Sequence, residues 1–412
     1  MYINREVAQK ALKYINNDEI LIFTGARQTG KTTILKYLRN YLKKRDKITF
    51  FINLEDIDYL NLLNETPKNL LNLIELHLHK IPVYVFIDEI QYLNNPSNFL
   101  KYIYDEYKGK IKLIVSGSSA FYIDRKFKDS LAGRKKIFYV YPLSFNEFLL
   151  FKGNEKLHKK YCEKVSIQSF TLENFLLPDK RELTRYFNEY VRFGGYPRVV
   201  LENQYEDKIQ LIEEIANSYI KKDVLETNIN YIEKYYELFR IFSSQVGGLV
   251  NKYELSNLLN ISITAIENYL YIMQKSFHVI LIKPFYSNIR KELRKMNKVY
   301  FYDIGLRNYF YKNFDMIEIR ADKGQLYENF ILIELLNRIN ADKIRFWRTQ
   351  TKNEVDFIID ERFAFEVKYN VNTFSPGKYN LFLNKYKEIK FNVIYHTGEK
   401  MVESNNINYF KF

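Results

Sequence analysis

Residues 25–32 read Gly-Ala-Arg-Gln-Thr-Gly-Lys-Thr, and this stretch decides the fold. It fits the pattern G-x-x-x-x-G-K-[ST], whose glycines let backbone amides curl around phosphate groups with no side chain in the way. An apolar strand pattern precedes it at 19–24, and a helical pattern follows from about 31 to 44. The positive N-terminal end of that helix points at the same anion. The motif therefore predicts a phosphate-binding loop between a strand and a helix.

The residue types in this loop indicate which parts of a nucleotide they contact. We expect Lys31 to pair with the β- and γ-phosphates of ATP, and so to serve catalysis, and the Thr32 hydroxyl to ligate Mg²⁺. The cofactors predicted for the loop are accordingly ATP and Mg²⁺. The nucleotide-binding residues expected here are Gly25, Ala26, Arg27, Gln28, Thr29, Gly30, Lys31, Thr32 and Thr33.

A second stretch supports the same interpretation. Residues 83–89 read Val-Tyr-Val-Phe-Ile-Asp-Glu, an apolar strand that ends in two carboxylates. We expect Asp88 to hold Mg²⁺, directly or through water, and Glu89 to polarise the attacking water. A carboxylate pair at a strand end can also be merely solvated. The phosphate loop upstream, at a fitting distance, favours the catalytic interpretation.

Short apolar strands alternate with helical stretches through the first third of the chain. This alternation predicts an α/β fold with a parallel sheet covered by helices on both faces. Ligands of such sheets bind at the carboxyl ends of the strands, where each motif of the nucleotide site falls. The expected strands are residues 19–24, 48–54, 83–87 and 112–116.

Two further positions are candidates for contact with the terminal phosphate. Ser118 or Ser119, after the fourth strand, would sense the γ-phosphate, although ordinary turn chemistry explains these serines equally well. Arg134 lies in a basic stretch and would act as an arginine finger, in cis or from a neighbouring subunit. A plain surface residue is an equal alternative for Arg134.

Taken together, these motifs resemble the AAA-type ATPases of archaea and bacteria. The resemblance rests on residues 25–33, 86–91, 115–119 and 131–134. In that group the ATPase domain precedes an uncharacterised C-terminal region, which this chain also matches at 194–197 (Gly-Gly-Tyr-Pro), 298–306 and 354–357. The resemblance implies a AAA+ P-loop fold at residues 1–144 and covers nearly the whole chain. It supplies no biological role.

Beyond the first domain, strand signals give way to helical patterns. Residues 145–235 are expected to form a helical lid or linker, and 236–305 a winged-helix-like module. In that module, helices near 251–260 and 262–275 would precede two strands joined by a basic stretch, an arrangement that resembles a winged helix. Thr264, Glu267 and Asn268 would face out towards DNA. Winged helices also serve as protein-binding or lid elements, so both interpretations stay open.

The segment 306–412 carries a second set of carboxylates. Glu328 lies in an apolar helix, Asp356 in one strand, and Glu366 and Lys368 in another strand about ten residues further on. Residues two apart in a strand share a face, so Glu366 and Lys368 point the same way. If the two strands pair, Asp356 joins them. Carboxylates with water can bind Mg²⁺, and the metal with Lys368 could activate a water against a phosphodiester.

This arrangement resembles the PD-(D/E)xK fold of restriction and repair nucleases. The resemblance implies a restriction-endonuclease-like α/β domain with Asp356 and Glu366 as metal ligands, Lys368 as the catalytic lysine and Glu328 as the helix carboxylate. The sequence departs from the pattern at Val355, where the family has proline. Glu354 remains a possible accessory carboxylate. An active nuclease and an inactive scaffold both agree with the sequence.

Composition limits the remaining choices. The chain has 412 residues, of which 47% are hydrophobic, which suggests several domains with substantial cores and excludes global disorder. The formal charge of +14 favours an anionic partner, DNA first, although a solvated lysine-rich face is an alternative. One cysteine, no signal-peptide pattern and no long apolar run predict a cytoplasmic protein without a membrane partner.

The function predicted from these observations is ATP hydrolysis coupled to DNA binding or processing, with a magnesium-dependent nuclease-like tail. The alternative is a nucleotide-dependent switch that binds a protein partner and carries an inactive tail. A homo-oligomer is compatible with both.

Overall fold

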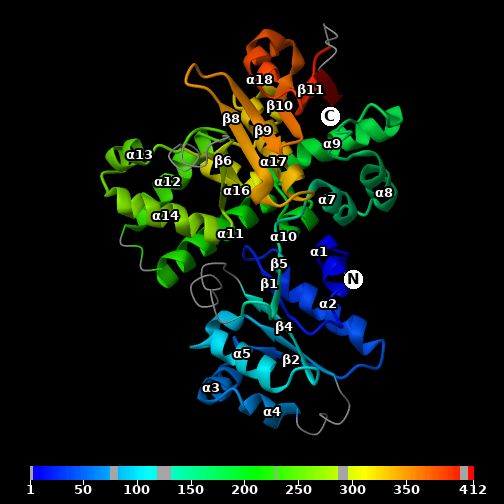
Figure 1. Ribbon diagram of the computed structural model, residues 1–412, viewed down its shortest axis with the longest axis vertical. Coiled ribbons are helices and arrows are strands. Elements are labelled where there is room, and N and C mark those ends of the chain that lie inside the picture. The colour runs from blue at the N-terminus through cyan, green and yellow to red at the C-terminus, as the bar shows by residue number, and fades with distance from the viewer. Residues whose placement is uncertain are drawn as a thin grey trace. The chain divides into compact units, whose positions relative to one another are not determined.

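The computed structural model describes residues 3–74, 82–117, 131–227, 229, 231–285, 296–399 and 407–412 (Figure 1). The chain divides into two compact units, residues 1–142 with 275–277 and residues 143–274 with 278–412. The division lies close to the predicted limit at 144, whereas the limits at 235 and 305 fall inside the second unit. None of the described helices combines the length and the apolar character that crossing a lipid bilayer requires.

The first unit is built on a five-stranded sheet with the order β2-β3-β4-β1-β5. All four strand pairs are parallel. The carboxyl ends of the strands therefore meet at one edge, and β1 and β3 deliver the glycine loop and the two carboxylates to it. The strands are β1 (Ile20–Thr24), β2 (Thr49–Asn53), β3 (Val83–Asp88), β4 (Ile111–Gly117) and β5 (Lys135–Tyr139).

Side chains alternate between the two faces of this sheet, and each face has its own apolar core. Ile20 and Ile22 pack on one face with α3, α4 and α5. Leu21 and Phe23 pack on the other face with α1 and α2. Two covered faces explain why the strand sequences are continuously apolar. The helices are α1 (Glu6–Leu12), α2 (Lys31–Lys43), α3 (Ile57–Glu65), α4 (Asn69–Ile74) and α5 (Pro96–Glu106).

The strand β5 was not expected from the sequence. It begins with Lys135 and Lys136, and only Phe138 of its five residues is buried. It lies at the edge of the sheet, next to β1. An edge strand carries charged residues readily, so its sequence lacks the apolar run that marks the four other strands.

The second unit begins with helices and ends with a sheet. Its helices are α7 (Phe145–Phe151), α8 (Glu155–Lys164), α9 (Leu177–Phe193), α10 (Pro197–Leu201), α11 (Tyr205–Thr227), α12 (Ile232–Ser244), α13 (Lys252–Leu259), α14 (Ile263–Lys275), α16 (Ile304–Tyr311), α17 (Lys323–Leu336) and α18 (Asn380–Lys385). Ser144 starts the first of them with a capping box, in which it accepts a hydrogen bond from the Glu147 N–H.

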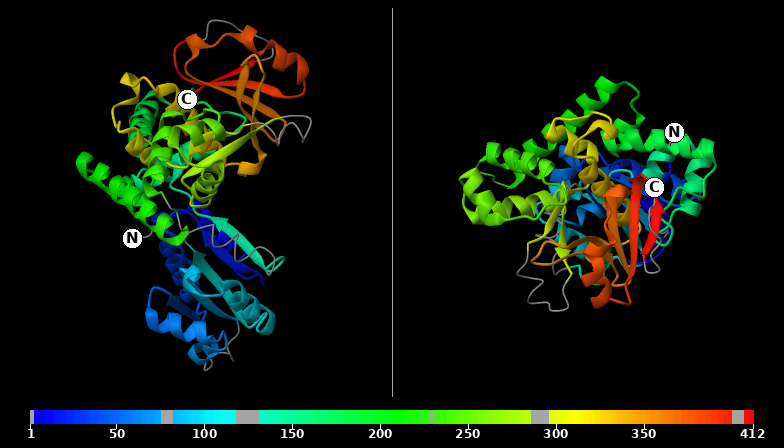
Figure 2. Two further views of the ribbon diagram at one scale, coloured as in Figure 1. Left: turned by 90° about the vertical axis from the view of Figure 1, so that its left-hand side faces the viewer. Right: turned by 90° about the horizontal axis from the view of Figure 1, so that it is seen from above.

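A seven-stranded sheet with the order β12-β11-β10-β9-β8-β6-β7 completes this unit. Figure 2 shows its C-terminal strands β10 to β12 side by side in orange and red. The two strands of the predicted wing, β6 and β7, belong to the same sheet, because β6 pairs with β8. The strands are β6 (Val279–Pro284), β7 (Lys298–Phe301), β8 (Ile344–Arg348), β9 (Glu354–Ile359), β10 (Phe363–Asn370), β11 (Lys390–Thr397) and β12 (Ile407–Lys411).

The Gly194-Gly195 turn is fixed by a buried acid. The carboxylate of Asp303 accepts hydrogen bonds from the N–H of Gly195 at 2.7 Å and of Leu306 at 2.8 Å, and so caps α16. Gly194 has φ +75°, and a Cβ there would lie 2.4 Å from the Asp303 carboxylate. Both glycines therefore have a structural explanation: Asp303 approaches Gly194, and the Leu143 carbonyl oxygen would lie 2.2 Å from a Cβ at Gly195.

Candidate functional sites

The glycine loop connects the end of β1 to the start of α2 and contains two residues with a left-handed backbone. Gln28 and Gly30 both have positive φ, 56° and 93°. When residues with a left-handed backbone alternate with residues that have a right-handed backbone, successive N–H groups turn towards a common centre. A Cβ at Gly30 would meet nothing within 4 Å, whereas a Cβ at Gly25 would lie 2.0 Å from the Val140 carbonyl oxygen. The loop is thus open at Gly30 and tightly packed at Gly25.

Lys31 is held inside this loop. Its side chain is 5% exposed, and its ammonium donates to the carbonyl oxygens of Gly25 at 3.0 Å and Ala26 at 2.8 Å. Burial lowers the pKa of Lys31 to about 8, although the carboxylates of Glu89 and Asp88 oppose the shift. The loop therefore holds a partly desolvated cation that phosphate oxygens would stabilise.

Asp88 lies at the end of β3 among hydroxyl groups. It is 3% exposed, and the hydroxyls of Ser116 and Thr32 hydrogen-bond its carboxylate. Burial raises the pKa of Asp88, and these two hydrogen bonds partly offset the effect. The structure thus joins the two predicted Mg²⁺ ligands, Thr32 and Asp88. Hydroxyl and carboxylate oxygens are ligands that Mg²⁺ prefers, so the residues present fit the metal.

Glu89 follows with an unusual backbone. Its φ of 57° is in the left-handed region, which is uncommon for a residue other than glycine. Its N–H donates to the Ser116 hydroxyl at 3.2 Å, and its carboxylate accepts from the Gln91 amide. Such outliers concentrate at functional sites, and this one turns Glu89 away from the line of the strand.

Arg5 was not foreseen from the sequence. It lies just before α1 and is 5% exposed. Its guanidinium donates to the carbonyl oxygens of Thr29 at 2.8 Å and Tyr141 at 2.9 Å. It therefore ties the glycine loop to the segment after β5. No short motif marks such a residue, because its importance arises from a contact across 24 positions of sequence.

The structure does not bring Arg134 to the glycine loop of its own chain. Its carbonyl oxygen accepts from the Ile20 N–H at 2.8 Å, at the start of β1, whereas the loop follows the end of that strand. Its guanidinium forms an ion pair with Asp105 at 2.7 Å. A role in a neighbouring subunit stays a prediction. Ser118 lies outside the described residues.

In the second unit, the predicted nuclease-like residues do converge. Asp356 on β9 and Glu366 on β10 lie on paired antiparallel strands, and Asp356 Oδ2 accepts from the Val367 N–H at 2.9 Å. Lys368 forms an ion pair with Glu366, and Glu328 reaches the same region from α17. These four side chains therefore lie close together, and their nuclease-like role stays a prediction.

One residue that the sequence analysis missed lies at the centre of these carboxylates. Lys298, on β7, is 1% exposed and contacts the carboxylates of Glu328, Glu354 and Asp356. Both oxygens of Asp356 are therefore engaged, Oδ1 by Lys298 and Oδ2 by the Val367 N–H. Among the described residues, no group of three or more acidic, histidine or cysteine side chains is free to hold a metal ion. With Lys298 in this position the residues do not fit Mg²⁺, and no cleavage step follows from the geometry.

Burial shifts the pKa values of the carboxyl groups in this cluster. Burial, with the nearby Asp356 charge, raises the pKa of Glu366 to about 8 and that of Glu328 to about 7. Burial alone would also raise the pKa of Asp356, but the ammonium groups of Lys298 and Lys368 outweigh it and hold that pKa below its usual value. Asp356 consequently stays ionised at neutral pH.

The predicted DNA-reading helix corresponds to α14. Its Thr264, Glu267 and Asn268 are exposed, and Glu267 forms an ion pair with Lys252 of α13 at 2.6 Å. Of the basic stretch 290–298, residues 290–295 lie outside the described part, and Lys298 is buried in the carboxylate cluster. The face of α14 is therefore open, but it shows little positive charge.

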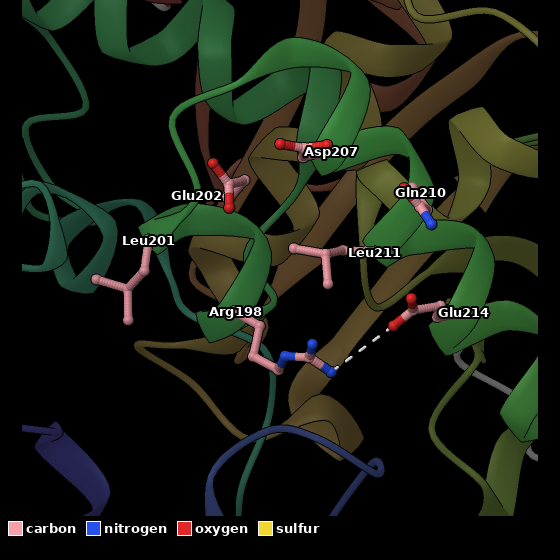
Figure 3. Close-up of a pocket in the computed structure, with 7 residues that line it drawn as sticks. All are labelled: Arg198, Leu201, Glu202, Asp207, Gln210, Leu211 and Glu214. Carbon is pink, nitrogen blue, oxygen red and sulfur yellow. Dashed lines mark ion pairs between the residues drawn. The ribbon is translucent and has the colours of Figure 1, made fainter.

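A groove of about 420 Å³ lies on the surface of α10 and α11 (Figure 3). Arg198 points across it towards Glu214, with 3.8 Å between the charged atoms. Glu202 and Asp207 add further negative charge, so the groove does not suit a phosphate group. No residue predicted from the sequence lines it.

Comparison with known families divides the chain into three parts. Residues 17–149 match the family described as AAA domain. Residues 184–316 and 323–411 each match a domain of unknown function, DUF8612 and DUF4143. The first match, with the geometry around Lys31 and Asp88, supports a P-loop ATPase of the AAA type. Because the other two families have no described function, the winged-helix and nuclease-like interpretations remain predictions.

The chain also resembles proteins over nearly its full length. It is 28% identical to the uncharacterized protein MJ1544 of Methanocaldococcus jannaschii, over 98% of this chain and 86% of that protein. It is 25% identical to an uncharacterized protein of Haemophilus influenzae, over 94% and 92%. Among solved structures, AMPPCP-bound DnaA from Aquifex aeolicus has 18% identity and a TM-score of 0.29, over 65% of this chain and 86% of that one. No functional conclusion follows from so low a score.

Proposed function

We propose that the protein binds ATP with Mg²⁺ in the loop 25–32 and hydrolyses it. The observation that carries this proposal is that the loop and β3 bring the Thr32 hydroxyl close to the buried carboxylate of Asp88, beside the buried Lys31. A hydroxyl and a carboxylate that meet beside a desolvated lysine form a cation site next to an anion site. This combination suits a nucleotide whose phosphates carry a metal.

Each side chain then has a defined part in hydrolysis. Lys31 exchanges the carbonyl oxygens of Gly25 and Ala26 for phosphate oxygens, and its charge opposes the charge that develops during transfer. Thr32 and Asp88 would hold the metal, which supplies further charge neutralisation when bound. Glu89, turned away from the strand by its left-handed backbone, orients the attacking water and accepts its proton.

The decisive experiment measures ATP turnover and ATP binding in parallel. Glu89→Gln removes the proton acceptor but keeps the shape, so kcat should fall on the order of 100-fold or more while the Kd for ATP stays within about twofold. Glu106→Gln, an exposed acid on α5, is the matched control and should behave as wild type. Unchanged turnover in Glu89→Gln would refute the assigned role.

The proposal extends to coupling with DNA. It draws support from the net charge of +14. We expect ATP turnover to rise when DNA is added, and the affinity for DNA to fall steeply between about 50 and 200 mM salt, because phosphate contacts release counterions. This part of the proposal would be refuted if adding DNA left ATP turnover unchanged, or if the affinity for DNA did not depend on salt.

A second candidate function is a nucleotide-dependent switch that binds a protein. Tyr253 and Leu258 on α13 favour it, because they are 72% and 65% exposed, and apolar residues there suit a protein partner better than DNA phosphates. The Glu89→Gln variant, held in its ATP state, separates the two candidates. Retention of a protein partner only with ATP, together with no response to DNA, would favour the switch.

A further inference from the structure

The ammonium group of Lys298 has three carboxylate partners. Its Nζ lies 3.2 Å from Oε1 of Glu328, 2.5 Å from Oε1 of Glu354 and 3.2 Å from Oδ1 of Asp356. An ammonium group has three hydrogens to donate and no acceptor. The ammonium donates hydrogen bonds to Glu328 and Asp356 and forms an ion pair with Glu354, so each of these three oxygens faces the same central cation.

The fold leaves Lys298 little freedom to move away. Its strand β7 pairs with β6, and Asn329 of α17 hydrogen-bonds both the N–H and the carbonyl oxygen of Phe301 at 2.9 Å. The same helix carries Glu328. With 1% of Lys298 exposed, its charge has no route to water while these contacts hold. An unpaired ammonium buried there would be strongly unfavourable.

Most of the remaining oxygens of the cluster already have partners. Asp356 Oδ2 accepts from the Val367 N–H, and Glu366 Oε1 is paired with Lys368. Glu354 Oε2 accepts from Arg348. Among the described residues, Glu366 Oε2 is buried without a hydrogen-bond partner, and the contacts of Glu328 are made by its Oε1. Mg²⁺ requires near-octahedral coordination by oxygens, and a second cation beside Lys298 would be repelled.

We propose that Lys298 is a built-in cation that takes the place of a divalent metal in the C-terminal carboxylate cluster. The folded second unit accordingly binds no Mg²⁺ or Mn²⁺ at Asp356, and any contact it makes with DNA is binding without metal-dependent cleavage. Without the ammonium group of Lys298, the carboxylates become able to bind a metal ion. The Lys298→Met variant, which retains most of the side-chain volume, exposes the carboxylates of Glu328, Glu354 and Asp356 to a metal ion.

The test is a titration with Mn²⁺, followed by calorimetry and by electron paramagnetic resonance of the bound ion. All variants carry Lys31→Ala and contain no nucleotide, so that the glycine loop does not contribute. The Lys31→Ala protein should bind no Mn²⁺ at the carboxylate cluster, so adding Asp356→Asn should leave its Mn²⁺ binding unchanged. Adding Lys298→Met should create one site with at least about tenfold tighter Mn²⁺ binding, and Asp356→Asn should abolish it.

Thermal unfolding provides the second readout. The unfolding midpoint of the Lys298→Met variant should rise with Mn²⁺ concentration, because a ligand that binds only the folded state stabilises it. The matched control is Lys343→Met, which breaks the exposed ion pair of Lys343 with Asp360 at 3.0 Å and should show no response to Mn²⁺.

Two results would overturn the proposal. One is a Mn²⁺ site in the Lys31→Ala protein that Asp356→Asn removes. The other is a folded Lys298→Met variant that gains no site. If Lys298→Met does not fold, the titration of the Lys31→Ala protein with and without Asp356→Asn decides alone, and the absence of a site supports the proposal. ATP turnover by wild type is independent of these outcomes.

Discussion

The affinity for ATP should fall as the pH rises through 8, because the lysine of the glycine loop begins to lose its proton there. In the free protein, burial lowers the pKa of Lys31 from 10.5 to about 8. Bound phosphates favour the charged lysine and raise that pKa again. ATP binding above this pH must therefore be accompanied by uptake of a proton, and the cost of that uptake grows as the pH rises.

The magnitude follows from the two pKa values. If the bound state restores the ordinary value, Lys31 is charged in both states near pH 7, and the Kd is then at its lowest. At about pH 9 most of the free protein has lost the proton, so the Kd should be about tenfold higher, a loss of about 1.4 kcal/mol of binding free energy. The phosphates themselves complete their ionisation at lower pH and add little to this change.

The assay is calorimetric titration with a non-hydrolysable ATP analogue and Mg²⁺ in buffers of different ionisation enthalpy. We expect uptake of about one proton per nucleotide near pH 9 and almost none near pH 7. Lys31→Arg is the matched control, since a guanidinium stays charged throughout this range. A Kd for wild type that does not change between these pH values, or an equal change in Lys31→Arg, would refute the reasoning.

Three further predictions concern packing and positioning. Gly25→Ala places a Cβ 2.0 Å from the Val140 carbonyl oxygen, so the free energy of unfolding of the first unit should fall by about 1–3 kcal/mol; an unchanged urea midpoint would contradict this. Ser144→Ala removes the capping hydrogen bond of α7 and should cost about 1 kcal/mol, measured in the same way; no change would show that the cap is not needed. Arg5→Met frees the Thr29 carbonyl and should weaken ATP binding several-fold with little change in kcat once saturated; a fall in kcat alone would speak against a positioning role.

The sequence predicted the parallel sheet of the first unit because its evidence is local. A glycine motif between a strand and a helix, and an apolar strand ending in Asp88 and Glu89, are patterns in consecutive residues. The structure places these groups at one sheet edge and adds the Thr32 to Asp88 hydrogen bond. The sequence did not predict β5, because this edge strand starts with two lysines and has no apolar run.

The surroundings of the second site could not be predicted in the same way. Asp356, Glu366 and Lys368 were recognised from their spacing along two strands. Lys298 was assigned to a basic wing, because its neighbours in sequence are basic and nothing local distinguishes it from them. Only the pairing of β6 with β8 shows that this wing belongs to the sheet of the carboxylates and brings the lysine among them.

The assignment of a nucleotide site to loop 25–32 is tested most directly by equilibrium binding of a non-hydrolysable ATP analogue, with and without Mg²⁺. Wild type should bind the analogue more tightly with Mg²⁺, and Asp88→Asn should lose that enhancement, because Asp88 would hold the metal. Lys31→Ala should lose at least about 100-fold in affinity under both conditions. Lys31→Ala protein that is folded and binds the analogue as tightly as wild type would show that the nucleotide does not lie in this loop.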